Sequence, residues 1–338
     1  MPNHHKPINL ALQGGGAHGA FTWGVIDKLL EDGRLTFDAV SGTSAGALNA
    51  VVMIDGFERG GSDGARERLQ EFWMRVSHGA GKVEPGNEIL DQIIGFWRSS
   101  MQSFPLFQRF AAGASPYRFN PLNINPLRDL LESLVDFERV RHCKAARLFI
   151  SATNVRTGKI KVFSGKEVTA DAVMASACLP NLFQAVEIGG EAYWDGGYMG
   201  NPALFPFFED KGSDDILLVQ INPIRREAVP RTGTEIVERV SEITFNASLL
   251  RELRAIDFVN RLLAENRLDQ SKYRPNRMHR IEASRALENH GAATKLDTSL
   301  SFFVELRDAG RDAAATFLRR HYADVGVRAS LDLRAEFM

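Results

Sequence analysis

The sequence has few cysteines and no long apolar run, and these shortages exclude several classes of protein. Its 338 residues include only two cysteines, Cys143 and Cys178, which cannot build a disulfide framework and suggest a reducing compartment. Neither has the spacing of a metal-ligand motif, so we expect no metal and no cofactor. We also expect no transmembrane helix and no secretory signal in the polar residues 1–7. These features together predict a cytoplasmic protein.

The chain also has almost no net charge. Lysine and arginine number 41 and aspartate and glutamate number 42, so the formal net charge is −1 at pH 7. A balanced charge provides no general attraction to nucleic acid, and we expect no nucleic-acid partner. The length is sufficient for one large α/β domain, with or without an accessory helical region. The sequence does not determine the oligomeric state.

A glycine-rich turn at residues 14–19 is the first of three motifs that carry chemical information. It follows the apolar residues 8–12, which predict a buried strand, and precedes residues 20–30, which predict a helix. Its sequence, Gly-Gly-Gly-Ala-His-Gly, presents a run of backbone N–H groups with few side chains in the way. Such a turn at the beginning of a helix is suited to binding an oxyanion.

A second turn of the same kind contains the candidate nucleophile, Ser44. The turn lies between a predicted strand at residues 37–41 and a predicted helix at residues 47–54. Its Gly-x-Ser-x-Gly spacing is that of a nucleophile elbow, which presents a serine hydroxyl above the end of a sheet. Glycines flank the serine because a Cβ in so sharp a turn collides with neighbouring backbone. The alternative role for Ser44 is that of an ordinary helix N-cap.

The third motif is an aspartate at the end of a predicted hairpin. Residues 186–194 form two short apolar runs around a Gly-Gly pair, which indicates two strands joined by a two-residue turn. The second strand runs into Asp195, Gly196 and Gly197. Asp-Gly is a common turn dipeptide, but beside the two glycine-rich turns we interpret Asp195 as a candidate general base.

Taken in order, the three motifs resemble the signature of the patatin-like phospholipase family. That signature is a Gly-Gly-Gly-x-Arg/Lys-Gly oxyanion turn, a Gly-x-Ser-x-Gly elbow and an Asp-Gly-Gly/Ala base motif, and the resemblance covers roughly residues 8–205. It implies a serine–aspartate dyad, without histidine or metal, that acts on acyl esters of lipids. The implied residues are Ser44 and Asp195 for catalysis, Gly14, Gly15, Gly16, His18 and Gly19 for the oxyanion hole, Gly42, Thr43, Ala45 and Gly46 for the elbow, and Gly196 and Gly197 for the base motif.

At one position the chain departs from this signature. His18 stands where the family usually has arginine or lysine. Because histidine titrates near neutrality, a permanent charge is replaced by one that depends on pH. The departure leaves the expected role of the glycine amides unchanged.

The resemblance implies acyl transfer to water. Asp195 accepts the hydroxyl proton of Ser44 while Oγ attacks an ester carbonyl, and the amides around Gly15 and Gly16 bind the oxyanion. The alcohol leaves, and water then releases the fatty acid from the acyl-serine. Phospholipids, lysophospholipids, neutral glycerides and polyester-type esters all fit this scheme.

Residues 92–128 have an unusual composition, with no aspartate or glutamate but four arginines and seven aromatic residues. Such a surface buries its rings at the acyl boundary of a membrane and places guanidinium groups among phosphates. We expect a cap-like insertion that makes peripheral contact with lipid; packing on the protein's own core and lining an acyl tunnel are the alternatives. The aromatic residues expected at the membrane are Phe96, Trp97, Phe104, Phe107 and Phe110.

The alternation of strand and helix patterns predicts a three-layer wound α/β sheet with helices on both faces. We expect a catalytic domain over residues 8–223 and a C-terminal helical extension over residues 224–338, packed on the same domain. A glycine-rich break at residues 56–64 follows the elbow helix. Further helices are predicted at 65–76, 126–134, 170–178, 235–268 and 299–321, and further strands at 147–154, 159–163, 216–221 and 279–282.

An esterase with the α/β-hydrolase fold is one alternative to this interpretation. It would complete a Ser-Asp-His triad with a histidine after Asp195, and His279, His290 and His321 are available. In that fold several strands precede the nucleophile elbow, whereas here only one strand–helix unit precedes it.

Two non-catalytic functions are the remaining alternatives. The turn at residues 14–19 also has the Gly-x-Gly-x-x-Gly spacing of a dinucleotide-binding protein, which expects an acidic residue at the end of the next strand. Here Asp38 begins that strand, and Ser41 and Gly42 end it. A catalytically idle lipid-binding protein is the other possibility, although an idle site has no need to keep all three motifs.

Overall fold

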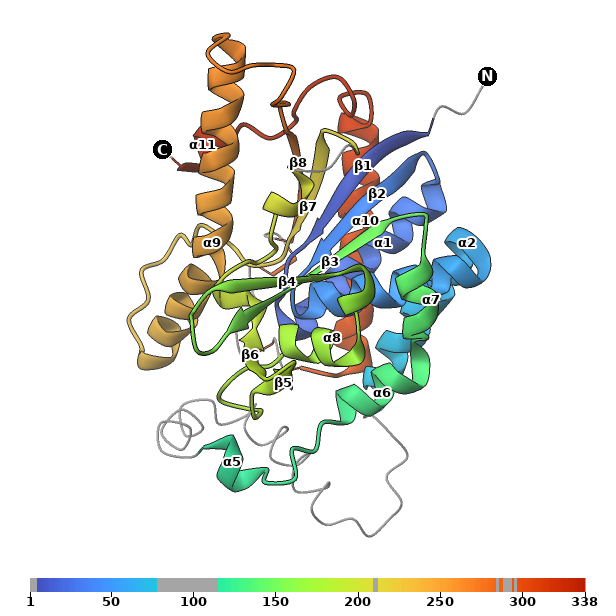
Figure 1. Cartoon of the computed structure of the whole chain (residues 1–338), viewed down its shortest axis with the longest axis vertical. Helices are drawn as coiled ribbons and strands as arrows, with labels where there is room; N and C mark the ends of the chain where they lie inside the picture. Colours follow the sequence, from blue (N-terminus) through green and yellow to red (C-terminus); the bar gives the residue numbers. More distant parts are fainter. Residues whose placement is uncertain are drawn as a thin grey trace.

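The computed structural model describes residues 5–77, 115–208, 212–283, 286–287, 294 and 297–337. These residues form one eight-stranded mixed sheet in the order β5-β6-β3-β2-β1-β7-β8, with β4 paired to β3 beside this path (Figure 1). The strands are β1 (Lys6–Leu12), β2 (Leu35–Gly42), β3 (Arg147–Asn154), β4 (Ile160–Ser164), β5 (Val186–Ile188), β6 (Glu191–Asp195), β7 (Asp215–Gln220) and β8 (Arg277–Glu282).

The centre of the sheet is parallel and buried on both faces. Strands β3, β2, β1, β7 and β8 run in the same direction, whereas β4, β5 and β6 add antiparallel pairings on the β3 side. All six residues of β7 are buried, which matches the nearly continuous apolar run expected of a central parallel strand. Parallel strands all end at the same side of the sheet, which we call the carboxyl end; the opposite side is the amino end.

One face of the sheet is covered by α1 (Gly19–Asp32), α2 (Ala45–Ser77) and α10 (Leu300–His321). Leu10 and Leu12 of β1 point into this larger core, together with Phe303 of α10. Helices α1 and α10 pack very closely, because a Cβ on Gly310 would lie 2.1 Å from the carbonyl oxygen of Phe21. Glycine at this crossing therefore sets the distance between the two helices.

The other face is covered by α9 (Gly233–Ala264), whose first turn is closed by a capping box between Thr232 and Glu235. Leu253 of α9 packs there against Ile216 and Leu218, the β7 residues that alternate with those facing the larger core. Helices therefore lie on both faces, as Figure 1 shows for α9 and α10, and the predicted three-layer wound sheet is confirmed.

The C-terminal part of the chain contributes to the same sheet. The strand predicted at residues 279–282 is present as β8, which begins two residues earlier and pairs with β7 along its whole length. The helix predicted at residues 299–321 is α10, which packs on α1 (Figure 1). Residues after 224 thus supply the edge strand β8, one helix on each face of the sheet (α9 and α10), and the short helix α11 (Leu333–Phe337).

The glycine-rich break after the elbow helix is much shorter than predicted. Helix α2 continues from Ala45 to Ser77 and is interrupted only at Gly60 and Gly61, whose backbone is not helical. The outer glycines of the predicted break remain helical and allow the two halves of α2 to pack closely, because a Cβ on Gly56 would lie 2.5 Å from the carbonyl oxygen of Gly64. Close packing, rather than a loop, explains this cluster of glycines.

The remaining helices are short. They are α5 (Pro116–Phe119), α6 (Pro126–Leu134), α7 (Phe137–His142) and α8 (Ala170–Ser176), with 3-10 turns η1 (Gly16–His18), η2 (Gly165–Glu167), η3 (Gly196–Tyr198) and η4 (Phe205–Phe207). Of the predicted cap at residues 92–128, only 115–128 are described, so Phe96, Trp97, Phe104, Phe107 and Phe110 lie outside the described residues. In the part of the chain that is described, no helix has both the length and the apolar composition needed to cross a membrane.

Candidate active site

The turn that the sequence predicted to be a nucleophile elbow lies at the carboxyl end of the sheet. Ser44 lies one residue beyond the end of β2, immediately precedes α2, and is half-buried. Its φ angle of 53° lies in the left-handed region, which costs energy for a residue other than glycine and is typical of functional turns. A Cβ on Gly46 would lie 2.2 Å from the carbonyl oxygen of Leu12, and one on Gly42 would lie 2.6 Å from that of Gly46. Both glycines are therefore required by the tightness of the turn.

Thr43 fastens the elbow to the loop that follows the base motif. Its Oγ1 lies 2.5 Å from the hydroxyl of Ser151 and donates to the carbonyl oxygen of Gly200 at 2.6 Å. The Ser151 hydroxyl also lies 2.9 Å from that oxygen. Two buried hydroxyls thus hold the elbow against residue 200, a connection that the sequence alone did not indicate.

The first glycine-rich turn lies directly against the elbow. A Cβ on Gly14 would lie 2.7 Å from Cβ of Ser44 and 2.7 Å from the carbonyl oxygen of Thr43. The pairing of Leu12 with Gly42 in the parallel β1–β2 ladder explains this contact, since both strands end at the same level. The two turns that the sequence places on adjacent strand–helix units are therefore adjacent in space.

Three N–H groups of this turn are already used within the protein. Gly14 donates to Oδ1 of Asn201 at 2.7 Å, and His18 donates to the carbonyl oxygen of Gly15 at 3.3 Å. Gly19 donates within η1. Among the described residues, no hydrogen bond engages the N–H of Gly15 or Gly16. Within the described residues, these two amides therefore remain without an internal acceptor.

Asp195 is fully buried at the end of β6. It pairs with Ala152 of β3, two residues beyond Ile150, which pairs with Gly42 of β2. Strand β4 pairs with both Ile150 and Ala152 from the other side, so β2 and β6 follow one another along the same edge of β3. The turns that carry Ser44 and Asp195 therefore lie next to each other along this edge of β3.

The surroundings of Asp195 are dry. Its Oδ1 accepts a hydrogen bond of 2.7 Å from the N–H of Gly197. Burial, together with the negative charge of Asp195, raises the pKa of the Cys178 thiol to about 12 and that of the Tyr198 phenol to about 12. Both neighbours therefore stay protonated at neutral pH, and the carboxylate faces groups that carry no charge.

One short segment at the end of α8 touches both candidate catalytic residues. The hydroxyl of Ser176 accepts a hydrogen bond of 2.9 Å from the N–H of Ser44. Two residues further on, the carbonyl oxygen of Cys178 accepts one of 2.7 Å from the N–H of Asp195. The side chain of Ser176 is fully buried, so this segment fixes the backbone of Ser44 relative to that of Asp195.

The side chain of His18 turns away from solvent. It is 3% exposed, its Nε2 lies 2.7 Å from the hydroxyl of Thr294, and its ring packs edge-on against Phe302 at 6.1 Å. The sequence predicted a pH-dependent charge beside the oxyanion at this position. In the structure the imidazole instead connects the turn to the segment that precedes α10.

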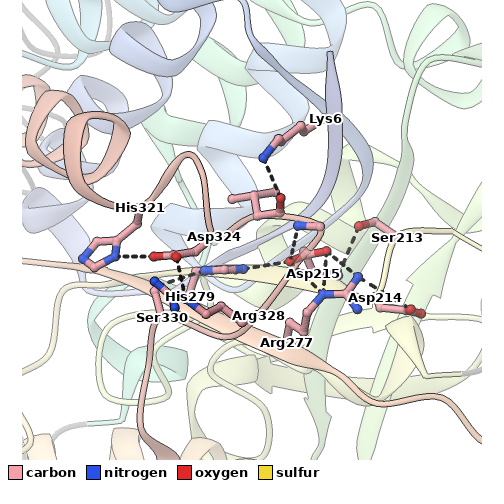
Figure 2. Close-up of polar contacts among 12 residues, drawn as sticks. Lys6, Ser213, Asp214, Asp215, Arg277, His279, His321, Asp324, Arg328 and Ser330 are labelled. Carbon is pink, nitrogen blue, oxygen red and sulfur yellow. Dashed lines mark hydrogen bonds and ion pairs between the residues drawn. The ribbon is translucent and has the colours of Figure 1, made fainter. Parts of the chain in front are cut away.

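The histidines considered for a catalytic triad lie elsewhere. His279 is fully buried in β8, where its Nε2 lies 2.9 Å from Asp215 and its Nδ1 lies 2.9 Å from the hydroxyl of Ser330 (Figure 2). Strand β8 is three strands from β2, a separation of about 14 Å. His321 pairs with Asp324 in the same network (Figure 2), and His290 lies outside the described residues.

No metal site emerges from the part of the chain that the structure describes. Within it, no group of three or more histidine, cysteine, aspartate or glutamate side chains is arranged to hold an ion. The arrangement at the carboxyl end therefore consists of a serine on a strained turn, two uncommitted backbone amides and a buried carboxylate. Ligands of open α/β sheets characteristically bind at this end of the strands.

Comparison with known proteins agrees with this geometry. The profile of the family described as patatin-like phospholipase matches residues 10–208, which is more than half of the chain. The chain therefore belongs to the patatin-like phospholipase family. Membership of this family indicates a hydrolase that acts on lipids. No protein of curated function matches the sequence.

Several solved structures are similar to the chain at low sequence identity. VipD from Legionella pneumophila has 17% identity and a TM-score of 0.45, over 94% of this chain and 67% of VipD. The type III effector protein ExoU has 16% identity and a TM-score of 0.36, over 93% of this chain and 53% of ExoU. A structure of the complex of SpcU with ExoU from Pseudomonas aeruginosa matches with 16% identity and a TM-score of 0.28, over 73% of this chain and 51% of the matched chain. The chain thus spans about two thirds of VipD and about half of ExoU.

Proposed function

We propose that this protein is a serine lipid acyl hydrolase that cleaves carboxylic esters of phospholipids or related lipids through a Ser44–Asp195 dyad. One observation carries the proposal: the strained Ser44 lies against the glycine turn that offers the amides of Gly15 and Gly16, at the sheet end where Asp195 is buried. A nucleophile, an oxyanion site and a base are the three groups that acyl transfer needs. Family membership supplies the lipid substrate class.

The reaction begins when Oγ of Ser44 attacks the ester carbonyl and Asp195 takes the hydroxyl proton. The carbonyl oxygen becomes an oxyanion and accepts hydrogen bonds from the amides of Gly15 and Gly16. Helix α2 begins at Ala45, so the positive end of its dipole lies beneath the developing charge. The alcohol takes the proton and leaves, and an acyl-serine remains.

Water completes the cycle. Asp195 removes a proton from water, the hydroxide attacks the acyl-serine, and the fatty acid leaves as the proton returns to Oγ of Ser44. A carboxylate with an ordinary pKa of about 3.9 is a weak base for a serine hydroxyl. Stabilisation of the oxyanion therefore has to supply a large share of the rate, which makes the geometry of the glycine turn decisive.

The test is fatty-acid release from phosphatidylcholine vesicles, lysophosphatidylcholine micelles and a triglyceride emulsion. Ser44→Ala should lower turnover by about a thousandfold or more, since it removes the group that forms the covalent intermediate. Ser41→Ala is the matched control, because Ser41 is a buried serine on β2, the strand that precedes Ser44, and its hydroxyl donates to the backbone oxygen of Ala203. Comparable activity in Ser44→Ala and wild type would refute the proposal.

A further inference from the structure

We propose that Asn222 is a positioning residue that aims the N–H of Gly15 at the oxyanion; the inference rests on the function proposed above. The peptide groups around Gly14 are held from two sides. Asn201 accepts from the N–H of Gly14 through Oδ1 at 2.7 Å, and Asn222 donates to the carbonyl oxygen of Gly14 through Nδ2 at 2.7 Å. The Nδ2 of Asn201 lies 3.5 Å from the same oxygen.

The hydrogen bond from Asn222 to the carbonyl oxygen of Gly14 also fixes the direction of the neighbouring Gly15 N–H. The carbonyl of Gly14 and the N–H of Gly15 belong to one planar trans peptide, so the two bonds point in opposite directions. Holding the oxygen against Asn222 therefore directs the N–H of Gly15 away from Asn222. Glycines on both sides of this peptide impose little rotational preference of their own, so the orientation depends on external hydrogen bonds.

Asn222 is itself anchored firmly enough to serve this purpose. It is 1% exposed and lies two residues after the end of β7. Its N–H donates to Oε1 of Gln13 at 2.8 Å, and its carbonyl oxygen accepts from Nε2 of Gln220 at 3.0 Å. Gln13 in turn donates through Nε2 to Asn246 of α9 at 2.9 Å. The amide of Asn222 therefore has little freedom to follow the Gly14 carbonyl if that group rotates.

A residue of this kind affects the transition state more than the bound substrate. The oxyanion exists only after Oγ has attacked, so a misdirected Gly15 amide lowers kcat and leaves KM nearly unchanged. Loss of one oxyanion donor costs on the order of a hundredfold in kcat. A merely structural asparagine would instead lower stability and leave the turnover of the folded enzyme intact.

Asn9 offers a matched control at the amino end of the sheet. It is also 1% exposed, and its Nδ2 also donates to a backbone oxygen at 2.7 Å, that of Ser213. Replacing either asparagine by aspartate keeps the shape but turns a donor into an acceptor, and replacing either by alanine removes the amide without burying a charge. The alanine pair keeps the comparison available if an aspartate variant does not fold.

The experiment measures kcat and KM on a soluble ester, the thermal midpoint, and the affinity for a trifluoromethyl ketone, whose serine adduct carries a tetrahedral oxyanion. We expect all four variants to be destabilised, but only Asn222→Asp and Asn222→Ala to lose kcat and ketone affinity, each about a hundredfold. Equal kcat values in the Asn222 and Asn9 variants would overturn the role of Asn222 while leaving the proposed function intact. A wild type that neither hydrolyses esters nor binds the ketone would overturn both.

Discussion

The two ends of the sheet present similar residue types but differ in how fully their hydrogen bonds are used. At the amino end, Ser330, His279 and Asp215 form a continuous chain of hydrogen bonds of 2.9 Å each (Figure 2), which is the composition of a Ser–His–Asp triad. At the carboxyl end, the residues proposed for catalysis are a serine and an aspartate, Ser44 and Asp195. Residue types alone would therefore draw attention to the amino end.

The amino-end network is saturated by the protein itself. Asp215 accepts from His279 and from Arg277 (Figure 2). It also accepts from the N–H of Gly326. Burial alone would raise the pKa of Asp215, but the hydrogen bonds from His279 and Arg277 outweigh it and lower this pKa to about 2. The N–H of Ser330 donates to the carbonyl oxygen of Met278. These contacts join β7, β8 and the segment after α10, which is a structural role.

The carboxyl end, in contrast, keeps donors available. Ser44 adopts a strained φ of 53°, and no described residue takes up the amides of Gly15 and Gly16. Strain and uncommitted donors cost stability and persist where function requires them. The comparison teaches that a serine, a histidine and an aspartate within reach of one another can be fully used in holding the fold, and it is why we propose the chemistry at the end where donors remain available.

The largest difference is expected between Asp195→Asn and Asp215→Asn. Asp195→Asn removes the proposed base and should lower kcat by about a thousandfold or more, with a small change in stability. Asp215→Asn breaks a buried ion pair and should lower the free energy of unfolding by about 3 kcal/mol, with kcat of the folded enzyme nearly unchanged. Urea unfolding and steady-state kinetics on both variants measure the two effects. A reversal of the two outcomes would place the chemistry at the amino end.

The imidazole of His279 should matter for stability and not for turnover. His279→Ala leaves Asp215 without one of its donors and opens a cavity beside Phe317, whose ring lies 6.0 Å from that of His279. We expect a loss of about 2–3 kcal/mol in unfolding free energy and kcat within tenfold of wild type. His321→Ala is the control, and we expect it to lower the unfolding free energy less, because His321 is more exposed than His279. A loss of kcat beyond about a hundredfold in either variant would favour a catalytic triad.

Glu252 of α9 should give the protein a pH-dependent stability. Its carboxylate accepts hydrogen bonds from the N–H groups of Leu204 and Phe205 at 2.7 and 2.8 Å, while burial raises its pKa from 4.5 to about 7. A raised pKa favours the protonated form in the folded state. The contribution of Glu252 is therefore complete below pH 4.5 and is lost as the pH rises through about 7.

Glu252→Gln isolates this contribution. Between pH 5 and pH 8 the stability of wild type relative to the variant should fall by an amount on the order of 2–3 kcal/mol, the value of a pKa shift of this size. Chemical unfolding at several pH values measures it. Parallel stability curves for the two proteins would show that Glu252 does not titrate in this range.

The smallest effect is expected at His18. Because the imidazole is buried against Phe302 and bonded to Thr294, His18→Ala should lower the unfolding free energy by about 1–2 kcal/mol and leave the shape of the kcat profile between pH 6 and pH 8 unchanged. His18→Lys introduces a side chain that does not titrate between pH 6 and pH 8, and it should also leave the shape of this profile unchanged. A profile that flattens in both variants would return His18 to the role that the sequence predicted, a titrating charge near the oxyanion.

Local patterns in the sequence were sufficient for much of the fold. Helix α6 and strand β3 have the predicted bounds, and α6 illustrates why: Asn125 caps it and Pro126 occupies its first turn. The predicted break at residues 56–64 was too long, because glycines needed for close helix packing look the same in sequence as glycines needed for a loop. Local sequence does not distinguish those two uses of glycine.

The supporting residues of the candidate site could not be predicted in the same way. Three short motifs identified Ser44, Asp195 and the glycine turn, because each role requires a fixed local spacing. Asn222 lies 208 residues from Gly14, and Ser176 lies 132 residues from Ser44. A single asparagine or serine has no local pattern that signals such a contact, so only the folded chain shows which residues hold the turn and the elbow.

The central claim is that Ser44, and not the serine of the amino-end network, is the nucleophile. It is tested most directly by labelling the protein with a fluorophosphonate, digesting it and locating the adduct by mass spectrometry. We expect a single adduct on the peptide that contains Ser44, unchanged in Ser330→Ala and absent in Ser44→Ala. An adduct on Ser330 that survives Ser44→Ala would contradict this account.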